Sequence, residues 1–391
     1  MARLGDVFES QIAGEWGSKC AENENGTKVL RTTNFTQEGR INYDDVVIRS
    51  INQSKVEKKR LHYGDIILEK SGGTAKTPVG RVVFCDEAIE DSIYLCNNFT
   101  QAMRVNQTIA IPRYVFYFMW NLHSSGKTDL LQNKTTGIRN LQVKSYLNEN
   151  CPLPPLEEQR KIAAVLDKVG DLIAKRKQQL EKLDELVKSR FVEMFGLGGY
   201  PRHALIELII EGAGLSYGIV QPGDNGTGDM GVLRPVDLVD GKISTAAIKY
   251  VDRSIGDGFK KTELTGDELL ITVRGTTGIT ALTDVRFKNM NVTRGIAVIR
   301  YDRSKINPEY LNAYLNTNES QCYIQEHTRG ATLQQINLAD LRTLEIFVPP
   351  RILQEKFAAF VEQTDKSKLA VQKSLDKLEL LKKALMQKYF G

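Results

Sequence analysis

Histidine is scarce in this 391-residue sequence and cysteine is unpaired, which limits the chemistry that the chain can carry. The four histidines lie far apart, and none has the spacing of a zinc signature. The five cysteines are odd in number and scattered, without a CxxC pair. We therefore expect no metal or redox centre, and we expect reduced, mostly buried thiols.

Long apolar runs are also missing. The longest, Tyr114 to Trp120, is too short to span a bilayer, and Met1–Ser10 has no apolar stretch typical of a secretory signal. These absences predict a cytoplasmic protein with no membrane attachment. The formal net charge of +5 is too small to indicate nucleic-acid binding by itself, so any DNA-binding surface must be a local patch.

The motifs of several enzyme classes are absent. There is no GxxxxGK[ST] phosphate loop, no GxSxG, no HExxH, and no Asn/Asp-Pro-Pro-Tyr/Phe motif of the amino-methyltransferases. GTGDMG at Gly226–Gly231 fits GxGxxG, but the following VLRPVDL indicates a strand or loop interrupted by Pro235. A dinucleotide site needs a helix N-terminus at that place. The sequence therefore predicts a binding protein with no cofactor and no catalytic centre of its own.

What the sequence does contain is a long repeat. PPLEEQRKIAAVLD begins at Pro154, and PPRILQEKFAAFVE begins at Pro349. Over these two 43-residue tails 13 aligned positions are identical, whereas roughly three are expected by chance. The segments before them match more loosely at offsets near 202, as in VLRTTNFTQEGRI with VLRPVDLVDGKI and GDIILEKSGGT with GDELLITVRGT. The pattern predicts a duplicated module and tail, with modules at residues 1–153 and 197–348 and tails at residues 154–196 and 349–391.

Each tail has the pattern of an amphipathic helix with a heptad seam. Pro-Pro suits a helix start, and apolar residues recur in steps of four and three. Gly170 and the polar stretch Asp365–Lys368 indicate that each tail divides into a short and a long helix. The predicted seam residues are Ile162, Leu166, Val169, Ile173, Leu180, Leu183, Val187, Phe357, Val361, Val371, Leu375, Leu378 and Leu385.

A single helix of this kind usually packs on its own domain. Two similar helices can instead bury their seams by pairing antiparallel, which would place the two modules in inverted orientation about a pseudo-twofold axis. A helix of about 25 residues is roughly 37 Å long, close to one turn of DNA. We therefore interpret the paired tails as a spacer, an antiparallel coiled coil between the modules.

The modules themselves predict mixed α/β structure, so the expected fold class is α+β. Gly64-Asp65 and Gly266-Asp267 indicate turns into strands. Apolar helices are expected around Tyr114–Leu122 and Pro308–Leu315, packed under the spacer. The expected strands are VVIRSI (Val46–Ile51), DIILEK (Asp65–Lys70), GRVVFCD (Gly80–Asp86), LLITVRG (Leu269–Gly275) and GIAVIRYD (Gly295–Asp302).

Basic and hydroxyl side chains in the module loops could read DNA, since Arg and Lys neutralise phosphates or bind guanine and hydroxyls serve base edges and phosphates. Taken singly, each is more often a solvated surface group. The lysine pairs present in both copies, and the glycine- and hydroxyl-containing loops after GDIILEK and GDELLIT, are the stronger candidates. The candidates are Arg31, Lys58, Lys59, Lys70, Ser71, Lys76, Arg81, Arg139, Arg234, Lys260, Lys261, Arg274, Thr276, Thr277, Arg294 and Arg329.

The sequence resembles the specificity subunit of type I restriction-modification systems. The resemblance rests on LPPLEEQRKIAAVLD and its helix, its echo VPPRILQEKFAAFVE, the stretches LSYGIVQPG and VLRPVDLVDGKI, and the two Gly-Asp strand starts, and it covers essentially the whole chain. It implies that each module is a target-recognition domain that reads one half of a split, asymmetric site in double-stranded DNA.

The resemblance also implies partners. Two modification subunits would carry S-adenosylmethionine and the adenine-N6 chemistry and dock on the tails, and two restriction subunits driven by ATP and Mg²⁺ would join for cleavage. Two alternatives remain open from the residues: a stand-alone DNA methyltransferase or nuclease, and a coiled-coil scaffold that binds only protein.

Overall fold

The computed structural model describes the whole chain except residues 21–25, 75–76, 135–137, 197, 214, 222, 224–227, 240 and 332. The described residues form two units, of which unit 1 is Met1–Lys177 with Lys373–Gly391 and unit 2 is Gln178–Gln372. Each unit combines helices with sheets, so the expected α+β class is confirmed. Helices α5 (Leu156–Phe195) and α9 (Arg351–Phe390) contribute a segment to both units.

The two tails form uninterrupted helices of 40 residues each. The predicted division at Gly170 and at Asp365–Lys368, and the expected length of about 25 residues, are therefore wrong. A glycine inside a helix costs only about 1 kcal/mol, which a long packed helix tolerates. In α9 the Thr364 hydroxyl donates to the carbonyl one turn earlier (2.9 Å), and Lys368 pairs with Asp184 of α5 at 2.6 Å. Both polar side chains are thus satisfied without a break in the helix.

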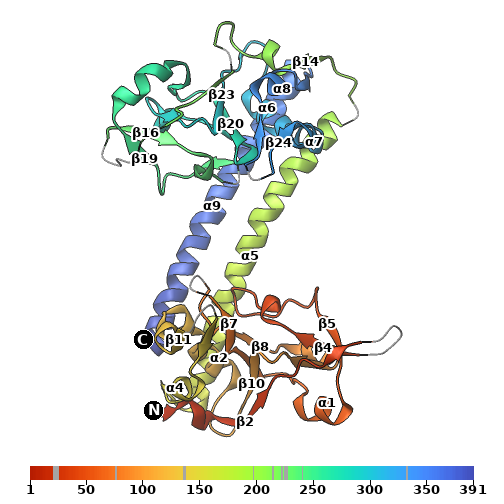
Figure 1. Cartoon of the computed structure of the whole chain (residues 1–391), viewed down its shortest axis with the longest axis vertical. Helices are drawn as coiled ribbons and strands as arrows, with labels where there is room; N and C mark the ends of the chain where they lie inside the picture. The colour runs from red at the N-terminus through yellow and green to blue at the C-terminus, as the bar shows by residue number, and fades with distance from the viewer. Residues whose placement is uncertain are drawn as a thin grey trace. The chain divides into compact units, whose positions relative to one another are not determined.

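Unit 1 contains two four-stranded sheets that share a core (Figure 1). Residues that alternate along strand β6 face opposite sides, because successive strand side chains point to opposite faces. Ile66 and Leu68 join the core beside the helices, whereas Ile67 joins the core toward the second sheet. The first sheet has the order β2 (Phe8–Ala13), β10 (Thr100–Val105), β6 (Ile66–Glu69), β8 (Val82–Phe84), and the second has the order β3 (Ser18–Lys19), β5 (Val47–Ser50), β4 (Thr27–Leu30), β9 (Tyr94–Cys96).

Shorter elements complete unit 1. The apolar helix predicted around Tyr114–Leu122 is present as α2, and it packs in the same core as residues of α5 and α9, as expected. The remaining elements are β1 (Ala2–Arg3) paired with β13 (Asn150–Cys151), the sheet β11 (Gln132–Lys134), β12 (Arg139–Leu141), β7 (Ser71–Gly73), and the helices α1 (Gln53–Lys59), α2 (Pro112–Ser124), α3 (Lys127–Leu130) and α4 (Val143–Leu147).

Unit 2 repeats this plan with its own loops. Leu269 and Ile271 of β20 face the helices, and Leu270 faces the other core. Its largest sheet has the order β15 (Leu215–Tyr217), β23 (Ile296–Ile299), β20 (Leu269–Arg274), β25 (Gln335–Ile336), β24 (Thr328–Arg329), with β21 (Thr276–Leu282) also paired to β20. The smaller sheets are β19 (Lys249–Val251), β16 (Met230–Leu233), β22 (Asn291–Val292); β17 (Leu238–Val239) with β18 (Lys242–Ile243); and β14 (Arg202–Ala204) with β26 (Glu345–Phe347).

The helices of unit 2 are α6 (Pro308–Leu315), α7 (Asn318–Glu326), α8 (Leu338–Arg342) and the 3₁₀ segment η6 (Arg253–Thr262). All five predicted strands and both predicted apolar helices are therefore present, with strand bounds shifted by a residue or more. Strand β16 directly follows the GTGDMG run, and Pro235 then begins a three-residue 3₁₀ turn (Pro235–Asp237). The helix that a dinucleotide site would need is not formed there, as predicted.

The repeated glutamine of the two tails explains why Pro-Pro and Gln recur at the same spacing. Gln159 is 1% exposed; its Oε1 accepts the backbone N–H of Ile111 (2.9 Å), and its Nε2 donates to the carbonyl of Pro154 (2.8 Å). Ile111 is the N-cap residue of α2. Gln354 joins the N-cap of α6 to the carbonyl of the first proline of its own tail in the same way, with both distances 2.8 Å. One buried amide therefore holds the tail to the module helix in each unit.

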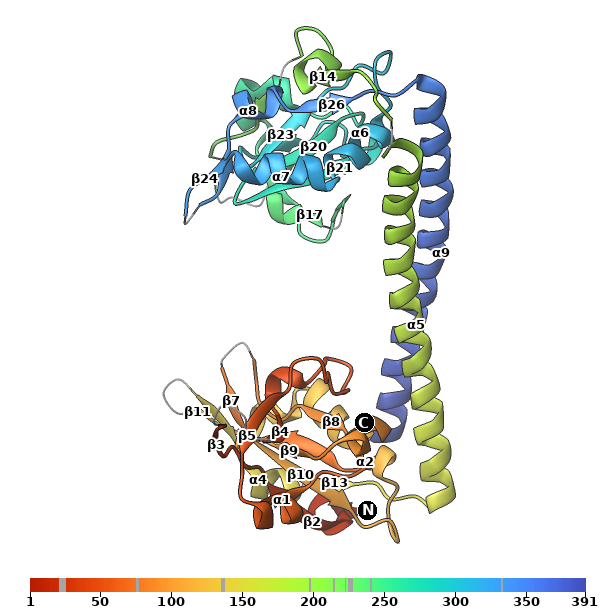
Figure 2. The same ribbon diagram turned by 90° about the vertical axis from the view of Figure 1, so that its right-hand side faces the viewer.

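Each long helix ends in the core of the unit that contains the other copy's module. Phe390, at the end of α9, packs in unit 1 with its ring centroid 5.2 Å from that of Tyr114. Phe195, at the end of α5, packs in unit 2 with its ring centroid 5.0 Å from that of Tyr310. Within unit 1 the start of α5 and the end of α9 lie side by side and run antiparallel, and Lys177 lies 4.0 Å from Glu379 across them (Figure 2).

The predicted seam residues face the protein interior to different degrees. Seven are buried, namely Ile162, Leu166, Val169, Ile173, Phe357, Val371 and Leu375. The other six, Leu180, Leu183, Val187, Val361, Leu378 and Leu385, are half-buried. The seam is therefore most deeply covered where a module packs on it.

Candidate nucleic-acid interface

A buried ion pair lies at the start of the central strand in both units. In unit 1 the Asp65 carboxylate, 1% exposed, accepts two hydrogen bonds of 2.8 Å from Arg104, and it also accepts the backbone N–H of His62 (2.9 Å). The bidentate hydrogen bond to Asp65 raises the pKa of Arg104. This pair fixes the turn that leads into β6.

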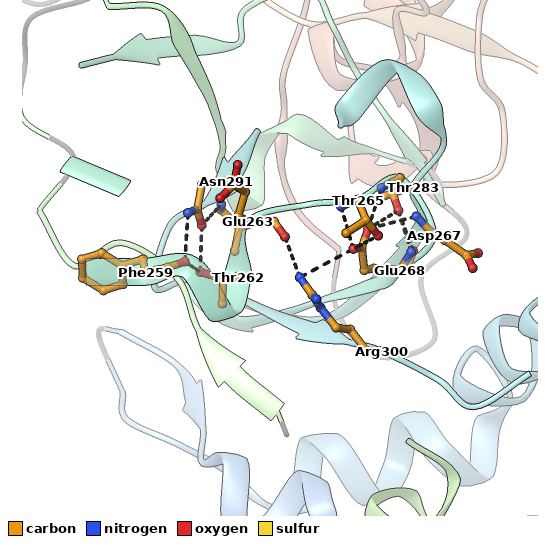
Figure 3. A network of polar contacts seen from close by, with 11 residues as sticks. Phe259, Thr262, Glu263, Thr265, Asp267, Glu268, Thr283, Asn291 and Arg300 are labelled. Atoms are coloured by element: carbon orange, nitrogen blue, oxygen red, sulfur yellow. Dashed lines mark hydrogen bonds and ion pairs between the residues drawn. The ribbon is translucent and has the colours of Figure 1, made fainter. Parts of the chain in front are cut away.

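Unit 2 has the same arrangement around Glu268, which is completely buried (Figure 3). Its carboxylate accepts the backbone N–H of Thr265 (2.8 Å) and the hydroxyl of Thr283 (2.9 Å), and it lies 3.8 Å from Arg300. Arg300 also donates to the carbonyl of Glu263 (2.6 Å), as Arg104 does to the equivalent carbonyl in unit 1.

These contacts change the register of the repeat. The sequence pairs Asp65 with Asp267, but the residue that takes the place of Asp65 is Glu268. The Asp267 side chain is 51% exposed and binds Arg303 at the surface. The match of the two Gly-Asp dipeptides is therefore one residue out of structural register, because burial and the arginine partner select the neighbouring carboxylate.

Four of the predicted DNA-binding residues are engaged in ion pairs inside their own module. Arg31 pairs with Asp45 at 2.8 Å, and Lys59 pairs with Glu15 at 2.8 Å. Arg81 makes two hydrogen bonds of 2.9 Å to the nearly buried carboxylate of Glu69, which raise its pKa. Arg234 binds Asp237 at 2.9 Å and 3.0 Å. A phosphate would have to compete with a carboxylate for each of these cations.

Other predicted residues are open to solvent. Lys58, Lys260, Lys261 and Arg294 are exposed, and no carboxylate of the described residues lies within 4.0 Å of them. Arg329 is 73% exposed and lies 3.9 Å from Asp340. The exposed residues, with Thr276 at the start of β21, are the ones that a DNA backbone can reach without disrupting a pair.

The remaining candidates are half-buried or buried. Lys70, Arg139 and Arg274 are half-buried. The Ser71 hydroxyl donates to Asn140 (2.5 Å), and Thr277, 5% exposed, shares a hydrogen bond with Thr328 (3.0 Å). These two hydroxyls therefore join neighbouring strands. Lys76 lies outside the described residues.

Sequence reasoning missed the polar residues that support the loops. Asn291, completely buried, and Thr262, 1% exposed, hold the end of η6 (Figure 3). Arg104, Arg300 and Glu268 were missed as well. None of these residues belongs to a run or motif, and only their partners across the fold reveal them.

The described residues contain no group of three or more His, Cys, Asp or Glu side chains that could hold a metal ion. Within the same part of the chain, no helix is long and apolar enough to cross a membrane. Three of the five free cysteines are buried, which agrees with the prediction of mostly buried thiols.

Comparison with known protein families decides the relationship. The profile of the type I restriction modification DNA specificity domain matches residues 1–183 and again residues 226–380. The chain belongs to this family. The two matches contain the two modules and most of the two long helices, so the family relationship and the internal repeat agree.

Relatives of this specificity family extend over much of the chain. The chain is 22% identical over 285 residues to the type I restriction enzyme EcoBI specificity subunit of Escherichia coli, which covers 65% of this chain and 60% of that protein. It is 24% identical over 389 residues to the StySPI specificity subunit of Salmonella potsdam, covering 93% of this chain and 81% of that protein. The S subunit of the type I restriction-modification system from M. genitalium has a similar fold, with a TM-score of 0.59, 13% identity and coverage of 100% and 95%.

Proposed function

We propose that this chain is the DNA-recognition subunit of a type I restriction-modification complex and reads a split, asymmetric DNA site with one module for each half. The observation that carries the proposal is the double match to the DNA specificity family, together with a module built twice around the same buried contacts. The residues that join module to helix are the same in both copies, whereas the loops differ. Such a division suits a constant frame that presents two different reading surfaces.

The long helices are proposed to act as the spacer and as the docking surface for partners. Repeat positions that are identical and exposed in both copies support this role, since burial does not explain their identity. They include Lys182 with Lys377, and Leu186 (48% exposed) with Leu381 (46% exposed). A large apolar side chain left exposed twice at the same place is typical of a surface that a protein partner covers.

The chemistry in this proposal belongs to the partners. Two modification subunits supply S-adenosylmethionine and adenine-N6 methylation, one for each half-site, and two restriction subunits supply ATP-driven translocation and cleavage. This chain supplies binding and position only, and it holds no cofactor. Each module would fix the register of the complex on DNA through phosphate contacts and select the sequence through base edges.

Adenine-methylome sequencing of cells with and without this gene tests the proposal. We expect a methylated motif that disappears with the gene and that has two specified halves, each with one methylated adenine, separated by unspecified bases. A contiguous motif would contradict the split-site mechanism. Methyl transfer to DNA by the purified chain with S-adenosylmethionine, without a modification subunit, would contradict the non-catalytic role.

A further inference from the structure

An open cavity of about 280 Å³ in unit 2 lies between the end of β15 and segment η6. Ser216 and Tyr217 line it from the strand, and Asp257, Phe259, Lys260, Lys261 and Thr262 are among the residues that line it from η6. Its walls therefore combine two ammonium groups with hydroxyls and aromatic rings, against a single carboxylate. This combination suits a phosphodiester and the sugar attached to it.

The equivalent place in unit 1 is closed by a carboxylate from the chain itself. The backbone N–H of Glu15 donates to the carbonyl of Cys96 (2.8 Å), and that of Ile219 donates to the carbonyl of Val292 (2.8 Å), so Glu15 and Ile219 occupy the same position in the two units. In unit 1 the Glu15 carboxylate neutralises Lys59 at 2.8 Å and Lys55 at 3.3 Å, and the hydrogen bond from Lys59 lowers its pKa.

In unit 2 this strand position is apolar. Ile219 is 1% exposed and lies in a small core against which Phe259 packs. Lys260 and Lys261 are exposed, and no carboxylate of the described residues lies within 4.0 Å of their ammonium groups. The strand therefore gives the cations of η6 no counter-ion, and an anion from outside can take that role.

The segment that carries the two lysines is held in an irregular shape by a buried amide. Asn291 donates through Nδ2 to the carbonyl of Phe259 (3.1 Å), and its Oδ1 lies 2.8 Å from the hydroxyl of Thr262. Phe259 has non-helical backbone angles (φ −125°, ψ 33°), so the chain bends immediately before the lysines. The residue at the position of Asn291 in unit 1 is Leu95, which cannot make these bonds.

From these relationships we infer that the cavity is a site for one phosphate group of the DNA backbone. Lys260 and Lys261 provide the charge, Ser216 and Tyr217 form the opposite wall, and Asn291 with Thr262 positions the lysine-bearing segment. The inference rests on the proposed DNA-reading function, and it assigns the second module a phosphate contact that Glu15 blocks in the first module.

The test is the salt dependence of binding of the full chain to a random-sequence DNA duplex, measured by fluorescence anisotropy. Each phosphate contact that is lost should reduce the slope of log K against log salt by roughly 1. We expect Lys260→Ala/Lys261→Ala to lower the slope by at least that amount and to weaken binding at low salt. Lys288→Ala, which removes an exposed lysine elsewhere in unit 2, is the control and should leave the slope unchanged.

Asn291→Leu introduces the residue found in unit 1, and Thr262→Val removes one hydroxyl at constant shape. Both should lower the slope in the same direction as the lysine variant, whereas circular dichroism and thermal unfolding confirm that unit 2 is folded. Glu15→Gln should raise the slope, because it frees the lysines of α1. If the wild-type chain binds DNA and the double lysine variant matches it or matches Lys288→Ala, the phosphate site is wrong. If the wild-type chain alone and with its modification subunit shows no DNA binding, the proposed function itself fails.

Discussion

Phe390 and Tyr114 pack together in the core of unit 1, with ring centroids 5.2 Å apart, although they come from opposite copies of the repeat. Phe195 and Tyr310 make the equivalent contact in unit 2 at 5.0 Å. The module of each copy is therefore completed by the end of the other copy's helix. This exchange explains why Phe195 and Phe390 are identical repeat positions: each fills the same aromatic pocket in the opposite unit.

The exchange predicts that damage at the C-terminus is felt in the first module. Phe390→Ala should destabilise unit 1 by about 3–5 kcal/mol, the range observed for removal of a buried phenylalanine ring. Hydrogen exchange resolved by peptide should show the loss of protection in α2 and β10. Lys388→Ala, an exposed neighbour on α9, should change neither element. Loss of protection confined to unit 2 would contradict the exchange.

The buried glutamine predicts a second, smaller effect on stability. Gln159→Leu and Gln354→Leu each leave a helix N-cap N–H and a proline carbonyl without partners, which costs roughly 1–3 kcal/mol for each buried unsatisfied group. Denaturant unfolding should show this loss for either variant. Gln178→Leu, at an exposed position of α5, is the matched control and should be nearly neutral. Equal stability of all three variants would mean that the amide bridge contributes nothing.

The register of the two units can be tested by three neutralising substitutions. Asp65→Asn and Glu268→Gln each leave a buried arginine without its carboxylate, so each should destabilise its own unit by about 3–5 kcal/mol. Asp267→Asn removes a surface pair with a half-exposed partner and should cost at most about 1 kcal/mol. Thermal unfolding of the three variants separates the cases. A large effect of Asp267→Asn with a small effect of Glu268→Gln would restore the register read from the sequence.

The stability of unit 1 should depend on pH through His123. Burial lowers the pKa of this imidazole, despite the nearby carboxylates of Glu69 and Asp129, and its Nδ1 lies 3.2 Å from the Thr128 hydroxyl. Because the folded pKa lies below the unfolded value of about 6.5, the unfolded chain takes up the proton first as the pH falls. The free energy of unfolding should therefore be unaffected above that pH and should decrease below it.

His123→Asn should weaken this pH dependence, since asparagine does not titrate. The measurement is denaturant unfolding of the wild type and the variant at about pH 7.5 and about pH 5.5, on either side of the unfolded pKa. The difference between the two proteins isolates His123 from the other three histidines. A variant that loses the same stability as the wild type between these two values would rule out the buried imidazole as the cause.

Local pattern was sufficient for much of the fold. Apolar runs bounded by glycine and charged residues placed β6, β8, β20 and β23, because a strand buried on both faces must be apolar at every position. Proline at the first helical position placed α2 and α6. The helix break at Gly170 was wrong for a physical reason as well: local propensity of about 1 kcal/mol is small beside the packing of a long seam.

The candidate site was less predictable, because an exposed cation and a paired cation look the same in sequence. Arg81 and Lys261 both stand near glycine or hydroxyl residues, yet Arg81 is bound to Glu69 and Lys261 faces an open cavity. The partner of each charge comes from another strand, and the residues that decide it, such as Glu15 and Asn291, carry no motif.

The sequence alone determined that the protein is a duplication of module and helix and that it belongs with DNA-specificity proteins, because periodicity and repetition are properties of the chain itself. Only the tertiary structure decided that each helix ends in the opposite module's core, which carboxylate is buried beside the strand, and which lysines remain open. These outcomes depend on burial and on contacts between residues far apart in the chain, and no local pattern records them.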